Sequence, residues 1–252
     1  MRPTKPVVQV GNTIRRPMRS WSPAIESLLK HLAAQRFDAA PRWIGVDEEE
    51  REVLTYVEGD VPEYPLPDYC WSEEALVAVA RLLRGFHDAT MSYRGVGDAW
   101  RFHYPGSNPS EVICHNDIAP YNTVYRERLP VAFIDFDTAG PGPRVWDVSY
   151  AAYRFVPLIP KEDYERHGVP DDLDIPRRLR GFTRAYGGLE GALIEELILR
   201  LGVLVSHIRS EAKKGVPWHV DDLARGHVEL YERHVDWLRA QGDLLSRALM
   251  DR

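Results

Sequence analysis

The chain has 252 residues, of which 44% are hydrophobic and 28% are charged, and its formal net charge is -6. This composition is typical of a globular protein and excludes a disordered chain. The acidic balance provides no concentrated basic face, so we expect no nucleic-acid partner, whereas a cationic partner is allowed.

The sequence favours a location in the cytoplasm. No run of about 18 apolar residues predicts a membrane span. Residues 1–9 lack the apolar region of a signal peptide. The two cysteines, Cys70 and Cys114, do not suggest a disulfide framework or a cysteine-based metal site. No pattern in the sequence indicates an oligomeric state.

The first 60 residues predict a small β-sheet with one helix. The expected strands span residues 7–10, 13–16, 42–46 and 52–57. Gly11 and Asn12 join the first two strands as a hairpin turn, because both residues tolerate positive φ angles. Ser22 and Pro23 are typical of a helix start, and apolar residues at helical spacing follow them.

A proline-containing stretch at residues 61–68 predicts a linker between two lobes. Beyond it, Ser72 is expected to cap a helix that runs to about residue 89. Further strands are expected at residues 112–114, 123–125 and 131–136, and long helices at residues 189–213 and 219–241. The prediction is an α+β fold with a small lobe at residues 1–60 and a mainly helical lobe at residues 61–252.

Polar residues with a regular spacing lie between the central strands. His115 and Asp117 form a His-x-Asp pair, Asn122 follows, and Asp135 comes after a short hairpin. Phosphoryl transfer needs a carboxylate near the attacking hydroxyl and oxygen ligands for magnesium. Asp117 can accept the hydroxyl proton, while Asn122 and Asp135 can bind Mg²⁺. The pattern therefore predicts a phosphotransferase site.

This run of residues, from Val112 to Val124 and from Phe133 to Asp137, resembles the catalytic and metal-binding loops of the aminoglycoside phosphotransferase and choline-kinase-like family. The resemblance implies a two-lobe protein-kinase-like fold. It also implies transfer of the ATP γ-phosphate, with Mg²⁺, to a hydroxyl of a small molecule, aminoglycoside-like or another metabolite. Residues 135–142 look closest to a subgroup labelled trifolitoxin-immunity-like.

The same resemblance implies roles for further residues. His115 would support the catalytic loop, and Asp147, within Trp146-Asp147-Val148, would brace it. Residues 13–17 look like the strand with the phosphate-binding cation, here Arg15 in place of lysine. Thr55, Tyr56 and Val57 would receive adenine, and Glu26 is a candidate partner for Arg15.

One feature departs from the family pattern. Six residues precede Val7, which leaves no room for a full glycine-containing strand and loop over the phosphates. An alternative interpretation is therefore a kinase-fold immunity or regulatory binding protein with weak or no catalysis. A protein kinase is disfavoured, since the few residues between Asp137 and Trp146 cannot form a long activation loop.

Other polar groups have simpler interpretations. Acidic clusters at residues 162–165, 171–172 and 221–222 could receive the amines of an aminoglycoside, but solvated carboxylates explain them more simply. His219, His227 and His234 are two turns apart in the last predicted helix, too far apart for one metal ion. Asp137 would share a face with Asp135 if their strand continued, and we assign it a supporting role.

Overall fold

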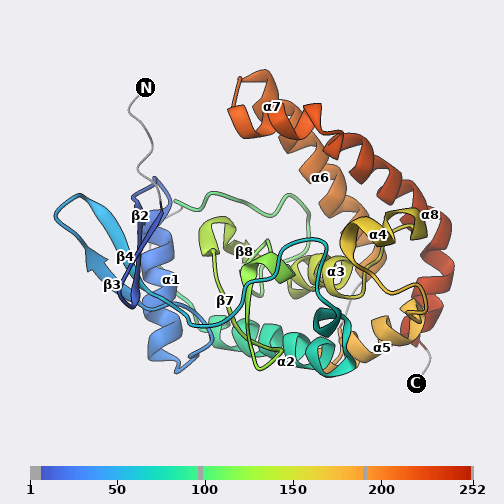
Figure 1. The fold of residues 1–252 in the computed structure, drawn as a ribbon, viewed down its shortest axis with the longest axis horizontal. Helices are drawn as coiled ribbons and strands as arrows, with labels where there is room; N and C mark the ends of the chain where they lie inside the picture. Colours follow the sequence, from blue (N-terminus) through green and yellow to red (C-terminus); the bar gives the residue numbers. More distant parts are fainter. Residues whose placement is uncertain (1–6, 96–98, 190–191, 251–252) are drawn as a thin grey trace.

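The computed structural model describes residues 7–95, 99–189 and 192–250 (Figure 1). The segment before Val7, on which the expectation of a shortened phosphate loop depends, lies outside the described residues. So do Glu190 and Gly191 in the helix predicted from residue 189. Within the described ranges, no helix combines the length and the apolar character needed to cross a membrane.

The N-terminal lobe consists of a four-stranded antiparallel sheet and one helix. Its strands are β1 (Val8–Val10), β2 (Thr13–Pro17), β3 (Trp43–Val46) and β4 (Arg51–Thr55), in the order β1-β2-β4-β3. Helix α1 (Ser22–Ala34) lies beside the sheet (Figure 1) and buries Ile25, Leu28, Leu29 and Leu32. Gly11, with φ of 59°, forms the predicted hairpin turn. Ser22 is the first residue of the helix and not its cap, and its hydroxyl accepts the Arg19 N–H and donates to Glu52.

The C-terminal lobe is mainly helical. Its helices are α2 (Glu73–Thr90), α3 (Arg144–Phe155), α4 (Tyr164–His167), α5 (Ile175–Tyr186), α6 (Leu193–Lys213), α7 (Pro217–Ala224) and α8 (His227–Met250). The Ser72 hydroxyl accepts the Ala75 N–H, as the predicted cap requires. The last predicted helix is two helices, α7 and α8, because Gly226 adopts a φ of 73° between them.

Two short antiparallel pairs lie where the polar residues of the sequence pattern are concentrated. Strands β5 (Val112–Cys114) and β8 (Gly140–Gly142) form one pair, and β6 (Thr123–Arg126) and β7 (Leu129–Phe133) form the other. The strand predicted through residue 136 ends at Phe133, since Asp135 adopts a left-handed φ of 59°. A strand therefore does not place Asp137 beside Asp135. A 3₁₀ turn, Phe136–Thr138, does so instead.

The two lobes share one hydrophobic core and a close backbone contact. The core extends from α1 through α2 to α8. Gly59 has a φ of 144°, and a Cβ atom there would lie 2.4 Å from the Tyr125 carbonyl oxygen. Asp60 and Tyr125 then exchange backbone hydrogen bonds of 2.8 and 2.7 Å. The segment at the predicted lobe boundary is thus attached to β6 of the hairpin.

Candidate active site

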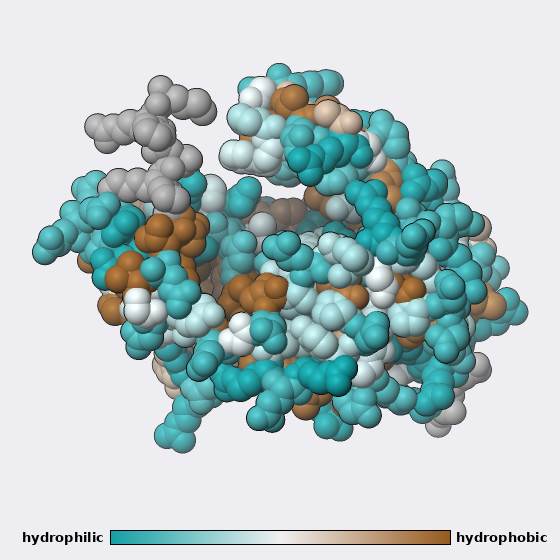
Figure 2. Space-filling view, in the orientation of Figure 1, coloured by the Kyte–Doolittle hydropathy of each residue, from teal (hydrophilic) through white to brown (hydrophobic). Residues whose placement is uncertain are grey.

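A cavity of about 390 Å³ lies between the sheet and the β6–β7 hairpin. Apolar side chains form much of its wall: Ile14, Leu54, Val57, Val61, Val124 and Ile134. Its charged residues are Arg16, Arg19, Asp135 and Asp137. All three residues predicted to receive adenine, Thr55, Tyr56 and Val57, line this cavity. Figure 2 shows a hollow between the sheet lobe and the overhanging α6–α7 region, with hydrophobic side chains exposed in it.

Asp117 is half-buried in the loop that follows β5, and both of its carboxylate oxygens are held in place. Oδ1 accepts the Tyr121 hydroxyl at 2.9 Å, and Oδ2 accepts the Asn122 amide nitrogen at 2.8 Å. The Asp117 N–H donates to His115 Nδ1 at 3.3 Å, while His115 Nε2 donates to the Ile134 carbonyl at 2.9 Å. The buried His115 thereby connects the Asp117 loop to the segment after β7.

Asn122 and Asp135 are brought together by the hairpin. The Asn122 carbonyl accepts the Ile134 N–H at 2.9 Å, which places Asn122 next to the residue preceding Asp135. Because the amide nitrogen of Asn122 faces Asp117, its amide oxygen points away from that carboxylate. The Asp135 side chain is 57% exposed and faces the cavity. Asp135 thus offers an exposed carboxylate at the cavity, and Asn122 lies beside the residue that precedes it.

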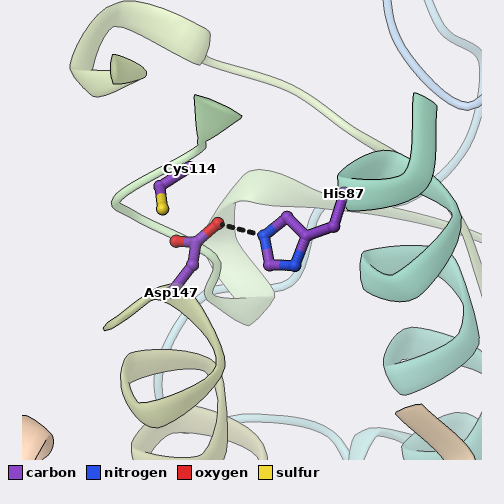
Figure 3. Close-up of side chains that lie close together, drawn as sticks. All are labelled: His87, Cys114 and Asp147. Atoms are coloured by element: carbon purple, nitrogen blue, oxygen red, sulfur yellow. Dashed lines mark hydrogen bonds and ion pairs between the residues drawn. The ribbon is translucent and has the colours of Figure 1, made fainter. Parts of the chain in front are cut away.

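Asp147 fixes the loop from below (Figure 3). Its Oδ2 accepts the His115 N–H at 2.7 Å, and its Oδ1 accepts the Asn116 N–H at 2.9 Å. His87 on α2 donates from Nε2 to Oδ2 at 3.1 Å and accepts the Tyr186 hydroxyl at Nδ1. Burial alone would raise the pKa of Asp147, but these hydrogen bonds and charges lower it. The carboxylate therefore stays ionised and holds the loop.

Cys114 lies near His87 and Asp147, but these three residues do not form a metal site (Figure 3). The His87 and Asp147 atoms that could bind an ion are hydrogen bonded to each other. The Cys114 thiol donates to the Pro143 carbonyl, and burial raises its pKa well above the usual value. A protonated thiol is a poor metal ligand. The cluster is part of the support for the loop.

Asn116 is a second point of attachment for the loop. Its side chain accepts the indole N–H of Trp146 at 2.7 Å and donates to the Thr138 carbonyl at 2.8 Å. Its carbonyl accepts Nη2 of Arg200 at 2.6 Å. Since Asn116 has a positive φ of 68°, these contacts hold a strained backbone just before Asp117.

Arg16 and Arg19 line the cavity, and the expected Arg15 does not. Arg16 lies opposite Glu52 in the β2–β4 ladder, so both side chains share a face, and Nε lies 3.0 Å from Glu52 Oε1. Side chains alternate along a strand, so Arg15 points to the other face and pairs with Asp47. Glu26, the expected partner of Arg15, pairs with Lys30 one helical turn away.

Arg16 also reaches the acidic residues after β7. Its Nη2 lies 2.8 Å from Asp137 Oδ1, and its Nη1 lies 3.6 Å from Asp135 Oδ1. Burial raises the pKa of Glu52, while Arg16 and the Ser22 hydroxyl oppose that rise. Sequence reasoning missed Arg16, Glu52, His87 and Tyr121. The pairing of residues 13–17 with 51–55 identifies the first two, whereas His87 and Tyr121 carry no local signal.

The model of the phosphotransferase enzyme family matches residues 94–190, which include Asp117, Asn122, Asp135 and Asp147. A curated relative, the trifolitoxin immunity protein of Rhizobium leguminosarum bv. trifolii, is 34% identical over 201 residues. The match covers 76% of this chain and 75% of the relative.

Two solved structures show the fold. The choline kinase of Streptococcus pneumoniae has a TM-score of 0.58 at 13% identity, and the match covers 93% of this chain and 89% of that one. A spectinomycin phosphotransferase in complex with ADP and spectinomycin has a TM-score of 0.58 at 11% identity, with 91% and 85% covered. The chain thus has a two-lobe protein-kinase-like fold with a small sheet lobe and a mainly helical lobe.

Proposed function

The chain belongs to the phosphotransferase enzyme family, and we propose that it transfers the γ-phosphate of ATP to a hydroxyl of a small molecule. The observation that carries the proposal is the Asp117 carboxylate. Tyr121 and Asn122 orient its two oxygens, and Asp147 fixes the loop on which it lies. A carboxylate held in this way is suited to accept a proton from a hydroxyl.

The cavity supports the assignment of ATP as the donor. Its apolar wall and the Thr55–Val57 segment suit a flat heterocycle. Arg16, which lines the same cavity, suits phosphate. A guanidinium presents several donors in a fixed plane and binds phosphate well. We therefore assign to Arg16 the phosphate-binding role that the sequence suggested for Arg15.

The residues present also fit Mg²⁺. Asn122 and Asp135 offer a neutral and a charged oxygen, and Asp137 lies close enough to contribute a second carboxylate through water. When bound, the ion would neutralise negative charge on the phosphates.

The transfer needs no covalent intermediate on the protein. The acceptor oxygen forms a bond to the γ-phosphorus while the bond between that phosphorus and the bridging oxygen breaks, and ADP leaves. The hydroxyl proton passes to Asp117. His115 and Asp147 touch no substrate in this scheme, since they hold the loop by backbone hydrogen bonds.

Magnesium-dependent ATP turnover tests the proposal. The wild-type chain would be assayed against aminoglycosides, amino alcohols, sugars, hydroxy acids and nucleosides, beside Asp117→Asn and Asp135→Asn. We expect turnover that one acceptor class stimulates and that both substitutions reduce by about 10² or more. Absence of any stimulated turnover, together with absence of ATP binding, would overturn the proposal.

The name of the curated relative favours a second candidate. A trifolitoxin immunity protein protects by an activity that its name does not specify, and a kinase fold could serve as a binding module. On this alternative, the chain would bind its partner with the same affinity in the wild type and in Asp117→Asn. If the wild-type chain confers immunity and a folded Asp117→Asn variant does not, catalysis would be favoured over binding alone.

A further inference from the structure

Arg154 on α3 is a buried cation that lies among tyrosines near Asp117. Its guanidinium lies 4.9 to 5.7 Å from the ring centres of Tyr121, Tyr150 and Tyr153. Nε and Nη2 donate to the Tyr150 hydroxyl at 3.1 and 2.7 Å, and Nη2 also donates to the Tyr231 hydroxyl at 3.4 Å. We call these four tyrosines and Arg154 the tyrosine–arginine cluster.

The charge of Arg154 has no carboxylate partner. Across residues 7–95, 99–189 and 192–250, no carboxylate oxygen forms an ion pair with its guanidinium. Neutral hydroxyl oxygens and ring faces offset only part of the cost of burying a cation. An anion that enters this region would therefore be stabilised strongly.

A second guanidinium reinforces this charge. Arg200 on α6 lies 4.7 Å from the ring centre of Tyr150, while Arg154 lies 5.0 Å from it. Arg200 is also buried, and within the described part of the chain it makes no ion pair with a carboxylate. Two buried guanidinium groups therefore lie beside the Tyr150 ring.

The hydroxyl groups of the cluster connect this charge to Asp117. The Tyr150 hydroxyl lies 3.4 Å from the Tyr121 hydroxyl, which donates to Asp117 Oδ1. Arginine cannot accept a hydrogen bond, so each hydroxyl that accepts from Arg154 keeps its own proton for another acceptor. Burial raises the pKa of Tyr150 to about 12, so its hydroxyl remains a donor. Tyr231 is half-buried and presents such a donor near the surface.

Several carboxylates of the acidic clusters that could have received amines already have basic partners. Asp163 pairs with Arg233 and His234. Asp222 accepts from His219 and His227, and Asp221 pairs with Arg225. These carboxylates do not offset the positive charge of the tyrosine–arginine cluster, because each already has basic partners.

We infer that the acceptor carries a carboxylate or phosphate that binds at the tyrosine–arginine cluster, while its hydroxyl lies at Asp117. This inference rests on the proposed function and narrows its acceptor to hydroxyl compounds that also carry an anion. Arg154 then determines specificity, and the Tyr231 hydroxyl donates directly to the anion. The cationic acceptor that the net charge allowed is the opposite class.

Four three-carbon probes isolate the charge of the acceptor. Glycerate, glycerol 3-phosphate, glycerol and 3-aminopropane-1,2-diol share hydroxyl groups and differ in one substituent. Their binding to the full chain without nucleotide would be measured by calorimetry. We expect at least one of the two anions to bind about tenfold or more tightly than glycerol and the amine. Comparing the two anions distinguishes carboxylate from phosphate.

Substitutions then locate the binding. Arg154→Met should abolish the preference for the anion, Arg154→Lys should keep part of it, and Tyr231→Phe should reduce it by several-fold. Thermal unfolding of each variant checks folding, and Tyr231→Phe serves if Arg154→Met does not fold. An unchanged preference for the anion in Arg154→Met overturns the inference. If Arg154→Met is unfolded, an unchanged preference in Tyr231→Phe does so instead. Binding of the amine as tight as or tighter than that of the anions, or no binding of either anion, also overturns it.

Turnover with Mg²⁺ and ATP separates this inference from the proposed function. Anion binding that depends on Arg154, without phosphorylation of any acceptor, would support the inference and count against the proposed function. Phosphorylation of cationic acceptors alone would support the proposed function and count against the inference.

Discussion

Arg16 Nη2 lies 2.8 Å from Asp137 Oδ1, so a cation on β2 joins the sheet to the turn that follows β7. The same guanidinium is paired with the buried Glu52 on β4 and approaches Asp135. A single side chain therefore connects the wall of the cavity with the acidic residues assigned to magnesium. Binding of a cation at Asp135 would compete with this ion pair and release Arg16 toward phosphate.

Arg16 and Arg15 provide a matched pair of variants for the nucleotide site. Arg16→Ala removes the guanidinium that lines the cavity, and we expect ATP affinity to fall by about 10-fold or more, since charge-assisted hydrogen bonds to phosphate are worth roughly 1.5–3 kcal/mol. Arg15→Ala removes an equal charge from the opposite face, so affinity should change less than threefold. Calorimetric titration with ATP and Mg²⁺ measures both. Equal losses in the two variants would contradict the assignment.

Asp135 and Asp137 should differ in how they affect magnesium. Asp135→Asn removes the exposed carboxylate in the cavity, and we expect kcat to fall by about 10² or more, with a higher Mg²⁺ concentration needed for half-maximal activity. Asp137→Asn mainly removes the ion pair to Arg16, so its effect should be smaller. Titration of Mg²⁺ at saturating ATP distinguishes the two. Identical Mg²⁺ curves for Asp137→Asn and Asp135→Asn would place both carboxylates on the ion.

The placement of Asp117, Asn122 and Asp135 around one hairpin could be predicted from sequence because their pattern is local. Asp117 and Asn122 are five residues apart, and Asp135 follows the hairpin whose strands the sequence also predicts. The arginine that faces the cavity was harder to predict, because Arg15 and Arg16 are adjacent. Only the register of β2 against β4 decides which one faces the cavity. A one-residue difference reverses the face of the side chain.

Other features depend on contacts between distant segments. His87 on α2 meets Asp147 on α3, and Arg154 meets Tyr231 on α8, with no sequence signal linking either pair. The break at Asp135 was missed for a different reason. Its β-prone neighbours predict a continuing strand, but the residue adopts a left-handed conformation that directs its side chain into the cavity.

Asp147→Asn should impair the loop without touching the substrate. An amide offers one oxygen, while Asp147 accepts the N–H groups of His115 and Asn116 and the Nε2–H of His87. We expect a loss of about 1–3 kcal/mol in the free energy of unfolding, since a buried donor loses its partner. We also expect a fall of roughly 10² in kcat from misplacement of Asp117. Urea unfolding and steady-state assays measure these effects.

Asp221→Asn is the control for that substitution. Asp221 on α7 is largely exposed and pairs with Arg225, the residue just after that helix, and a pairing of this kind contributes little to stability. The control should leave stability and kcat close to those of the wild type. If Asp147→Asn behaved like Asp221→Asn, the loop would not depend on the carboxylate.

His234 should make stability depend on pH. It is fully buried on α8, accepts the Tyr153 hydroxyl at Nδ1 and donates from Nε2 to Asp163. Burial lowers its pKa from 6.5 to about 4, although Asp163 opposes the shift.

The unfolded chain therefore binds a proton at His234 between pH 6.5 and about 4 while the folded chain does not, and stability is lost as pH falls through this window. The full loss, reached below pH 4, is about 3 kcal/mol. His234→Gln should flatten the pH dependence in urea unfolding between pH 4.5 and 7.5, whereas His103→Gln, at an exposed position, should preserve it. An unchanged slope in His234→Gln would show that other groups cause the loss.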